Sequence, residues 1–178
     1  VIGFTVPADE KIGPGDRYIL EQIRETKPNT PIVGIVTKLD KAGKDTVGER
    51  LLELHELLGP DAIIGLTTGT LELVRAANEH KDVIDYIGCG PFRATPTKDS
   101  GRAPIGLDGY PELVAASELP LVAIGDVTAD DAYDLAQQGV DGLAIVRGIM
   151  HANDSQAYCE RVVAEFERGA AACAATTS

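Results

Sequence analysis

Six short runs rich in Val and Ile recur along the chain, and each is followed by a segment with helical character. The runs are continuously apolar instead of alternating, which is typical of strands that are buried on both faces of a sheet. A repeated strand-then-helix order predicts parallel strands joined by right-handed crossovers. The pattern therefore constrains the chain to an α/β fold with one parallel sheet of about six βα units.

The predicted elements alternate along the whole chain. Strands are expected at residues 1–6, 31–36, 62–66, 83–88, 119–124 and 142–146, and helices at residues 16–26, 46–58, 71–80, 110–117, 129–138 and 156–172. Asp16 is predicted to cap the first helix, with Tyr18, Ile19 and Ile23 on one face. Because a closed TIM barrel requires about eight units, six units indicate either a half-barrel or an open, doubly wound sheet of flavodoxin- or Rossmann-like type.

The composition limits the partners of this chain. Its 178 residues suffice for one sizeable core, so a single domain over 1–178 is expected, with an Ala-rich tail at 170–178. The formal net charge is −12, and so acidic a surface repels nucleic-acid backbones and anionic lipids. Trp is absent and aromatic residues make up 4% of the chain, which argues against a stacking platform for single strands. Neither nucleic acid nor a membrane is expected as a partner.

The cysteine content indicates a reducing compartment. Cys89, Cys159 and Cys173 are odd in number and have no CxxC spacing, so a disulfide framework is not expected and a cytoplasmic location fits best. No apolar run reaches the roughly 20 residues of a membrane span, and no signal peptide is visible. The chain opens at Val1 inside a strand-like run, which suggests a processed or excised fragment.

The segment from residue 85 to residue 98 has the parts of an anion-binding loop. A short apolar strand ends in Gly88 and Gly90, and Thr95, Thr97 and Lys98 follow. Glycines let the backbone approach a ligand, the hydroxyls donate hydrogen bonds, and the lysine supplies charge. The sequence therefore predicts that this loop binds phosphate or pyrophosphate. The alternative is a solvated loop with a proline turn.

Roughly three-fifths of the chain, from about residue 58 to 169, resembles the second half of thiamine phosphate synthase, a TIM-barrel enzyme. The matching segments are 59–68, 88–91, 95–98, 105–109, 122–125 and 142–146. This resemblance implies a transferase that joins a pyrimidine pyrophosphate to a thiazole phosphate and releases pyrophosphate with Mg²⁺ assistance. It also implies that Thr95, Thr97 and Lys98 contact pyrophosphate.

The same resemblance assigns a thiazole-phosphate pocket to Gly125, Val146 and Arg147. Two residues depart from the pattern of the family. Asp126 follows Gly125 where a second glycine is usual, and Arg147 stands where serine is commoner. Arg147 is able to bind a phosphate bidentately, whereas Asp126 beside a phosphate repels it unless the side chain turns away.

Residues 1–57 do not look like the first half of that enzyme and are similar to part of the GTPase domain of the Era family. The matching segments are 7–24 and 36–40. Thr37, Lys38 and Asp40 match the guanine-reading NKxD loop of that family, with Thr37 in place of Asn. No GxxxxGK[ST] motif occurs anywhere in the chain, so any guanine-nucleotide binding should be weak.

Asp9 and Asp40 each follow a predicted strand, so both are candidates for a Mg²⁺ site at the carboxyl edge of the sheet. Helix capping and solvation are the alternative for both. His55, His80 and His151 lack ligand-like spacing and are interpreted as surface residues. Cys89 is interpreted as a small strand-end residue and not as a nucleophile. Because Asp9 and Asp40 supply only two candidate carboxylates, Mg²⁺ is expected only together with a phosphate ligand.

Two resemblances on one chain predict a chimera, engineered or recombined, in which a GTPase fragment over 1–57 joins a half-barrel over 58–169. The main functional hypothesis is a scaffold without efficient catalysis that keeps a phosphate-binding loop. The alternatives are a thiamine phosphate synthase, with Lys98 steadying the leaving group, and a weak guanine-nucleotide-binding module. Exposed sheet edges predict a homodimer.

Overall fold

A computed structural model describes residues 1–94 and 103–176 of the chain. Six strands form one sheet in the sequential order β1-β2-β3-β4-β5-β6. The strands are β1 (Ile2–Pro7), β2 (Ile32–Thr37), β3 (Ile63–Thr68), β4 (Tyr86–Cys89), β5 (Leu121–Ile124) and β6 (Gly142–Ala144). Strand β1 pairs with β2, β2 with β3 and β5 with β6, each in parallel. The predicted six-stranded parallel α/β fold is confirmed.

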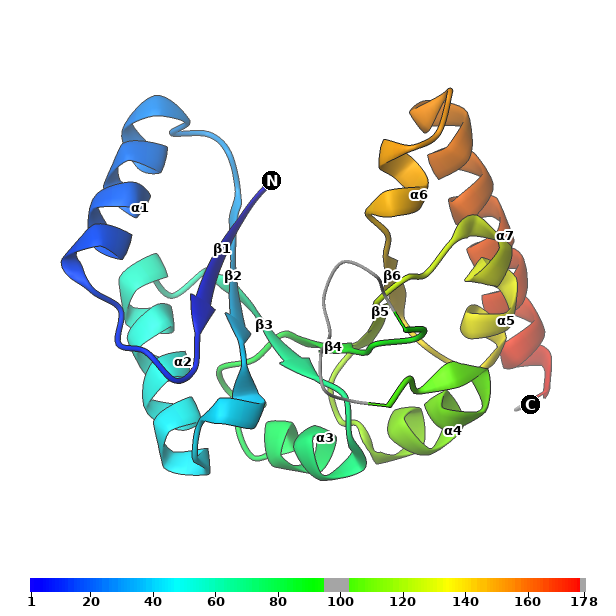
Figure 1. Cartoon of the computed structure of the whole chain (residues 1–178), viewed down its shortest axis with the longest axis horizontal. Helices are drawn as coiled ribbons and strands as arrows, with labels where there is room; N and C mark the ends of the chain where they lie inside the picture. The colour runs from blue at the N-terminus through cyan, green and yellow to red at the C-terminus, as the bar shows by residue number, and fades with distance from the viewer. Residues whose placement is uncertain (95–102, 177–178) are drawn as a thin grey trace. The chain divides into compact units, whose positions relative to one another are not determined.

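The helices alternate with the strands (Figure 1). They are α1 (Pro14–Thr26), η1 (Leu39–Lys41), α2 (Lys44–Leu58), α3 (Leu71–Asn78), α4 (Gly106–Ala116), η2 (Ala129–Asp131), α5 (Ala132–Gln137), α6 (Arg147–Met150) and α7 (Ser155–Thr176). The sequential strand order has no point at which it reverses, whereas doubly wound sheets reverse once. Of the two predicted arrangements, the order is therefore that of a barrel segment.

The chain divides into two compact units. Unit 1 comprises residues 1–67 and 76–87, and unit 2 comprises residues 68–75 and 88–178. The predicted boundary between residues 57 and 58 falls inside unit 1, at the end of α2.

Unit 1 is built by packing α1 and α2 beside β1 and β2. Arg24 of α1 donates hydrogen bonds to the Leu57 and Leu58 carbonyl oxygens at the end of α2, at 3.0 and 3.1 Å. A Cβ atom on Gly34 of β2 would lie 2.7 Å from a Leu58 methyl and 2.9 Å from a Leu54 methyl. The helix therefore packs closely on this face of the strand because Gly34 has no side chain.

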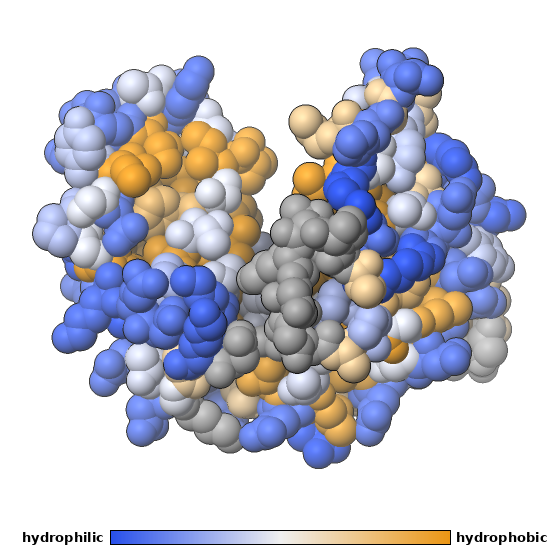
Figure 2. All heavy atoms as spheres, in the orientation of Figure 1, coloured by the Kyte–Doolittle hydropathy of each residue, from blue (hydrophilic) through white to orange (hydrophobic). Residues whose placement is uncertain are grey.

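Burial alternates along the first strand, so the prediction of strands buried on both faces is wrong for β1. Phe4 and Val6 are buried, whereas Gly3 and Thr5 are exposed. Phe4 pairs with Gly34, so the buried residues share the face that α2 covers. Figure 2 shows hydrophobic side chains gathered over β1 and β2 on the face that it displays. The apolar run in the sequence reflects one covered face and one partly open face.

Unit 2 has its own core around β5 and the carboxyl-terminal helices. Leu121, Ala123 and Leu135 are fully buried. A Cβ on Gly169 of α7 would lie 2.2 Å from the Tyr133 carbonyl oxygen of α5, so the two helices cross at very short range. Figure 1 shows α5 and α7 lying against each other.

Three local predictions differ from the structure. Helix α1 begins at Pro14 with Gly13 as its N-cap, and Asp16 contributes from inside the first turn, where its carboxylate accepts a hydrogen bond from the Gly13 N–H at 2.8 Å. Tyr18 and Ile19 are 61% and 53% exposed, and Leu20 supplies the buried contact. Helix α7 continues to Thr176, through most of the segment predicted as a tail. No helix in the described residues is long and apolar enough to cross a membrane.

Candidate functional site

The loops after β4 and β5 are joined by backbone hydrogen bonds within unit 2. The Phe92 N–H donates to the Ile124 carbonyl oxygen at 2.9 Å, and the Arg93 N–H donates to the Gly125 carbonyl oxygen at 3.0 Å. Gly125 has a φ of 89°, and a Cβ there would lie 2.6 Å from Pro91 Cα. The glycine at the end of β5 is required both by its left-handed backbone and by this close approach.

Arg93 holds the two loops together through its side chain. Its Nη1 atom donates to the Asp126 carbonyl oxygen at 3.1 Å and to Asp131 Oδ2 at 2.7 Å, and its Nη2 atom pairs with Asp131 Oδ1. The guanidinium carbon lies 4.4 Å from the centroid of the Phe92 ring. Such a forked contact fixes the guanidinium plane, so Arg93 orients the loop after β5.

Asp131 is the buried acid of this cluster, with an exposed fraction of 8%. Its carboxylate also accepts hydrogen bonds from the Thr128 N–H at 2.9 Å and from the Thr128 hydroxyl at 2.7 Å. Burial by itself raises the pKa of Asp131, but the hydrogen bonds from Arg93 and Thr128 outweigh burial and hold the pKa below its usual value. Asp131 therefore stays ionised near neutral pH.

The two residues that depart from the synthase pattern are in contact. Arg147 Nη2 forms an ion pair with Asp126 Oδ1, and their side chains are 43% and 21% exposed. Asp126 has a φ of 62°, a left-handed backbone that Gly adopts freely and that Asp tolerates better than most residues. The side chain of Asp126 is turned toward Arg147.

The predicted phosphate-binding residues have different outcomes. The structure links the Gly125 loop to Arg147 through the Asp126 side chain, and it leaves Val146 70% exposed beside Arg147. Thr95, Thr97 and Lys98 lie outside the described residues. Sequence reasoning missed Arg93 and Asp131, although an arginine two residues after the Gly90-Pro91 strand end was an available signal.

Cys89 is a structural residue, as predicted. Its side chain is fully buried, its Sγ atom lies 2.8 Å from Thr68 Oγ1, and its carbonyl oxygen accepts a hydrogen bond from the Tyr110 hydroxyl at 2.9 Å. Burial raises the pKa of the Cys89 thiol to about 11. The nucleophilic thiolate is therefore scarce at neutral pH.

The predicted guanine-reading loop lies in unit 1 and is tied to the end of β1. The Thr37 hydroxyl donates to the Val6 carbonyl oxygen at 3.4 Å, and the Ala8 N–H donates to the Thr37 carbonyl oxygen at 2.8 Å. Lys38 has a φ of 59°, and its Nζ atom lies 3.6 Å from Glu10 Oε1. The side chain of Asp40 lies outside the described residues.

The described residues do not assemble a metal site. They contain no group of three or more His, Cys, Asp or Glu side chains that could hold an ion. Of the two predicted metal candidates, Asp9 is exposed on the loop after β1. At the carboxyl edge of unit 2, Asp126 and Asp131 are both paired with arginines. Their carboxylates are therefore already neutralised and less suited to bind Mg²⁺.

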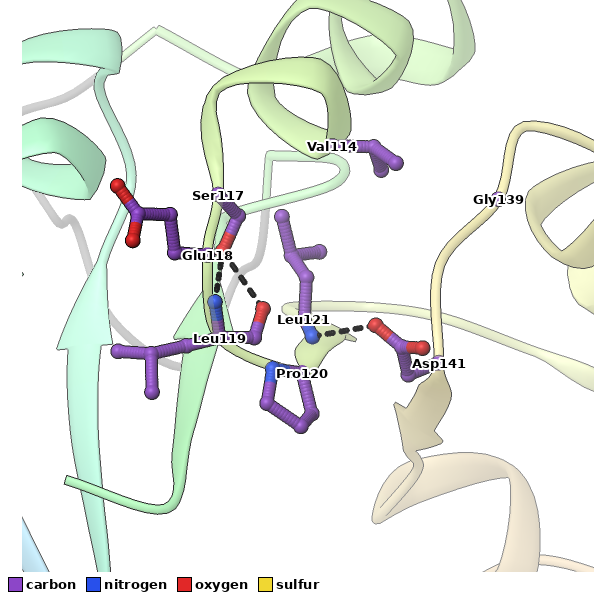
Figure 3. Close-up of a pocket in the computed structure, with 8 residues that line it drawn as sticks. All are labelled: Val114, Ser117, Glu118, Leu119, Pro120, Leu121, Gly139 and Asp141. Atoms are coloured by element: carbon purple, nitrogen blue, oxygen red, sulfur yellow. Dashed lines mark hydrogen bonds between the residues drawn. The ribbon is translucent and has the colours of Figure 1, made fainter. Parts of the chain in front are cut away.

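A cavity of about 310 Å³ lies at the opposite, amino end of β5 (Figure 3). Asp141 Oδ2 accepts a hydrogen bond from the Leu121 N–H at 2.7 Å, and the Ser117 hydroxyl donates to the Leu119 carbonyl oxygen at 2.6 Å. These polar groups serve the backbone around the start of the strand. This cavity is therefore not the candidate site.

The fold, together with the charged residues Arg93, Asp126, Asp131 and Arg147 at the carboxyl edge of the sheet, defines a TIM-barrel-like α/β protein. The sequence profile of the family described as "Thiamine monophosphate synthase" matches residues 46–149, and the chain belongs to this family. A thiamine-phosphate synthase of Corynebacterium jeikeium is 67% identical over 70% of this chain and 56% of its own length. The enzyme of Corynebacterium efficiens is 61% identical over 71% of this chain and 58% of its own length. The chain thus spans a little over half the length of these relatives.

A separate part of the chain is similar to another protein. GTPase Era of Corynebacterium diphtheriae is 63% identical over 59 residues, which are 33% of this chain and 19% of that protein. Among solved structures, thiamine phosphate pyrophosphorylase from Pyrococcus furiosus matches with a TM-score of 0.57 at 23% identity, covering 93% of this chain and 82% of that one. This likeness confirms the TIM-barrel-like fold. Together, the comparisons favour the synthase alternative over the hypothesis of a scaffold without efficient catalysis.

Proposed function

We propose that the carboxyl edge of unit 2 binds a phosphate-bearing ligand of the thiamine-phosphate synthase reaction, and that the protein acts as a transferase of this type. The observation that carries the proposal is the junction of Gly125, Asp126 and Arg147, inside the segment that matches the family. The left-handed backbone of Gly125 turns the chain after β5 so that Asp126 meets Arg147, and Arg147 offers a fork of donors that suits phosphate.

The reaction of this family joins a pyrimidine pyrophosphate to a thiazole phosphate. We assign the thiazole phosphate to Gly125, Val146 and Arg147, and the pyrophosphate to Thr95, Thr97 and Lys98, with Lys98 steadying the leaving group. When bound, Mg²⁺ would add charge neutralisation on the pyrophosphate. Because the described residues contain no group of three or more His, Cys, Asp or Glu side chains that could hold an ion, and Asp126 and Asp131 are paired with arginines, we expect Mg²⁺ to enter only with its phosphate ligand.

The identity to GTPase Era supports a second proposal, that residues 1–57 are a GTPase-derived segment fused to residues 58–169 of a synthase. We propose that this segment supplies βα units to the sheet and not a nucleotide site. The chain lacks a phosphate-binding GxxxxGK[ST] motif, and Lys38 of the guanine-reading segment is held by Glu10. Binding of GTP stronger than millimolar would contradict this assignment.

We also propose a homodimer. Strands β1 and β6 end the sheet order, and an unpaired strand edge is a template for pairing with another chain. Solution scattering or analytical ultracentrifugation gives the mass directly: a value near twice 18.8 kDa supports the dimer, and a value near 18.8 kDa contradicts it.

Calorimetric titrations test the binding proposal. Pyrophosphate, thiazole phosphate and GTP are titrated with and without Mg²⁺, and thiamine phosphate formation is assayed on the same samples. Lys98→Ala should weaken pyrophosphate binding, whereas Lys11→Ala, which removes the same charge from an exposed loop of unit 1, should not. Equal losses in both variants would indicate a general charge effect and contradict the Lys98 assignment.

The activity assay separates the hypothesis of an active synthase from that of a scaffold without efficient catalysis. Turnover that requires both substrates establishes a synthase. Phosphate binding without turnover would restore the hypothesis of an inactive scaffold, because the site would then bind its ligand without driving the transfer. Absence of both binding and turnover would reject the whole assignment of the carboxyl edge.

A further inference from the structure

Asp126 and Arg147 are joined within unit 2 although η2, α5 and β6 separate them along the chain. Asp126 follows β5, and Arg147 opens α6 after β6. The ion pair between them is partly exposed, with the carboxylate more covered than the guanidinium. An exposed pair of this kind is weak in itself, because water and salt screen it. Its position matters more than its strength, since Arg147 is the cation assigned to phosphate.

The backbone of Asp126 is held in a left-handed turn. The residue has a left-handed φ of 62° directly after Gly125, whose φ is 89°. Arg93 Nη1 holds the Asp126 carbonyl oxygen at 3.1 Å, and Arg93 is itself anchored on the buried Asp131. Arg93 therefore stabilises the turn through the Asp126 carbonyl oxygen, while the Asp126 carboxylate is left to pair with Arg147. Reorienting the carboxylate requires rotation of the side chain alone.

We infer that Asp126 is a built-in competitor for the phosphate site: its carboxylate occupies Arg147 in the free protein, and a phosphate-bearing ligand engages Arg147 only by displacing it. This inference rests on the proposed phosphate site. A carboxylate and a phosphate present similar oxygen acceptors to a guanidinium, so one exchanges for the other. Asp126 then lowers the affinity of the site for anions in general. It favours anions that bind the Arg147 guanidinium in a bidentate manner, as phosphate does.

Neutralising Asp126 should strengthen phosphate binding. The variant Asp126→Asn keeps the size of the side chain and tolerates the left-handed backbone, while it removes the charge. We expect its affinity for inorganic phosphate to rise roughly three- to tenfold at low ionic strength, the range expected for loss of one partly exposed charge contact. Asp126→Gly, which also suits a φ of 62°, should give a gain of at least the same size.

The matched control is Asp130→Asn. Asp130 is four residues further along, its side chain is 78% exposed, and it pairs with Arg161 of α7. This variant makes the same change in net charge and also breaks an arginine pair, but it leaves Arg147 untouched. Inorganic phosphate is titrated by calorimetry at constant ionic strength into the wild type, Asp126→Asn, Asp126→Gly and Asp130→Asn, with folding checked by circular dichroism.

Arg147→Gln and the double variant Asp126→Asn/Arg147→Gln show whether Asp126 acts through Arg147. Displacement predicts that the gain from Asp126→Asn disappears in the Arg147→Gln background. A gain that persists there means simple repulsion and overturns the inference. The guanidinium NMR signal of Arg147 in the absence of phosphate should also move in Asp126→Asn, and an unmoved signal would likewise contradict the pair.

The failure of the inference is distinguishable from the failure of the proposed function. Equal phosphate affinity in the wild type and Asp126→Asn overturns the competitor role and leaves the phosphate site intact. An equal gain in Asp130→Asn assigns the effect to net charge and overturns it as well. If neither the wild type nor any Asp126 variant binds phosphate, the proposed phosphate site is wrong and the inference fails with it.

Discussion

The two ends of β5 in unit 2 use aspartate in different ways. At the amino end, the Asp141 carboxylate accepts a hydrogen bond from the Leu121 N–H, and the Asp141 N–H donates to the Leu121 carbonyl oxygen, at 2.7 and 2.8 Å. At the carboxyl end, Asp126 and Asp131 are bound by arginines. A backbone partner cannot leave, whereas an arginine can exchange one anion for another. The amino end of β5 is therefore held by backbone contacts, whereas at the carboxyl end we propose that the partly exposed Asp126–Arg147 pair exchanges its anion.

The amino-end arrangement occurs twice. In unit 1, Asp85 Oδ2 accepts a hydrogen bond from the Ile64 N–H at 2.7 Å, and the Asp85 N–H donates to the Ile64 carbonyl oxygen at 2.8 Å. Asp85 directly precedes β4 and Asp141 directly precedes β6, so both aspartates bind the strand before their own. The same two-bond contact therefore fixes the start of two strand pairs and involves no charged partner.

The largest expected effect is at the carboxyl end, where Gly125→Ala should destabilise the fold. The added Cβ would lie 2.6 Å from Pro91 Cα, and the φ of 89° is strained for alanine. We expect a loss of about 3 kcal/mol in the free energy of unfolding, measured by urea denaturation, together with loss of phosphate binding. The control Gly142→Ala places a Cβ 3.5 Å from a Val122 methyl in ordinary contact and should cost less than about 1 kcal/mol. Equal losses would refute the special role of Gly125.

The next effect concerns the buried acid. Asp131→Asn should cost about 2 kcal/mol, because Arg93 and Thr128 lose a charged acceptor. Since the pKa of Asp131 is lowered in the folded state, its contribution is complete above the unfolded-state value of about 3.9 and is lost as the pH falls through the folded-state value. Urea denaturation between about pH 2 and 7 should therefore show a shallower acid decline for Asp131→Asn than for the wild type. A decline as steep in Asp131→Asn as in the wild type would contradict this contribution.

Much of the fold was predictable because it depends on a repeated pattern. Six Val- and Ile-rich runs and the helices between them gave the strand number and the parallel pairing. The same runs misled on burial, because hydropathy records that a strand is apolar but not how many of its faces are covered. In β1, Thr5 and Gly3 lie on the open face between the buried Phe4 and Val6. Helix α6 was missed because its four residues are too few for a helical period.

The site was predictable only where it depends on backbone freedom. Gly125 was singled out only through the resemblance to the family, and its role at phosphate stays a prediction; the structure shows that its left-handed φ and its contact with Pro91 require a glycine there. The ion pairs were not predictable, because they join residues that are far apart in the sequence. Arg93 and Asp131 are separated by 38 positions, and Asp126 and Arg147 by 21 positions. The two departures from the synthase pattern, Asp126 and Arg147, explain each other because they form an ion pair.

The smallest effect tests the amino ends of the strands. Asp141→Ala and Asp85→Ala each remove a carboxylate acceptor from one strand-initiating N–H, and each should cost about 1 kcal/mol by urea denaturation, because that N–H returns to water or goes unpaired. Since each carboxylate binds a backbone N–H and not an arginine, both variants should keep the phosphate affinity of the wild type. A change in phosphate affinity of Asp141→Ala, with Asp85→Ala as the matched control, would show that the two ends of β5 are coupled, and the division between a structural end and a binding end would then fail.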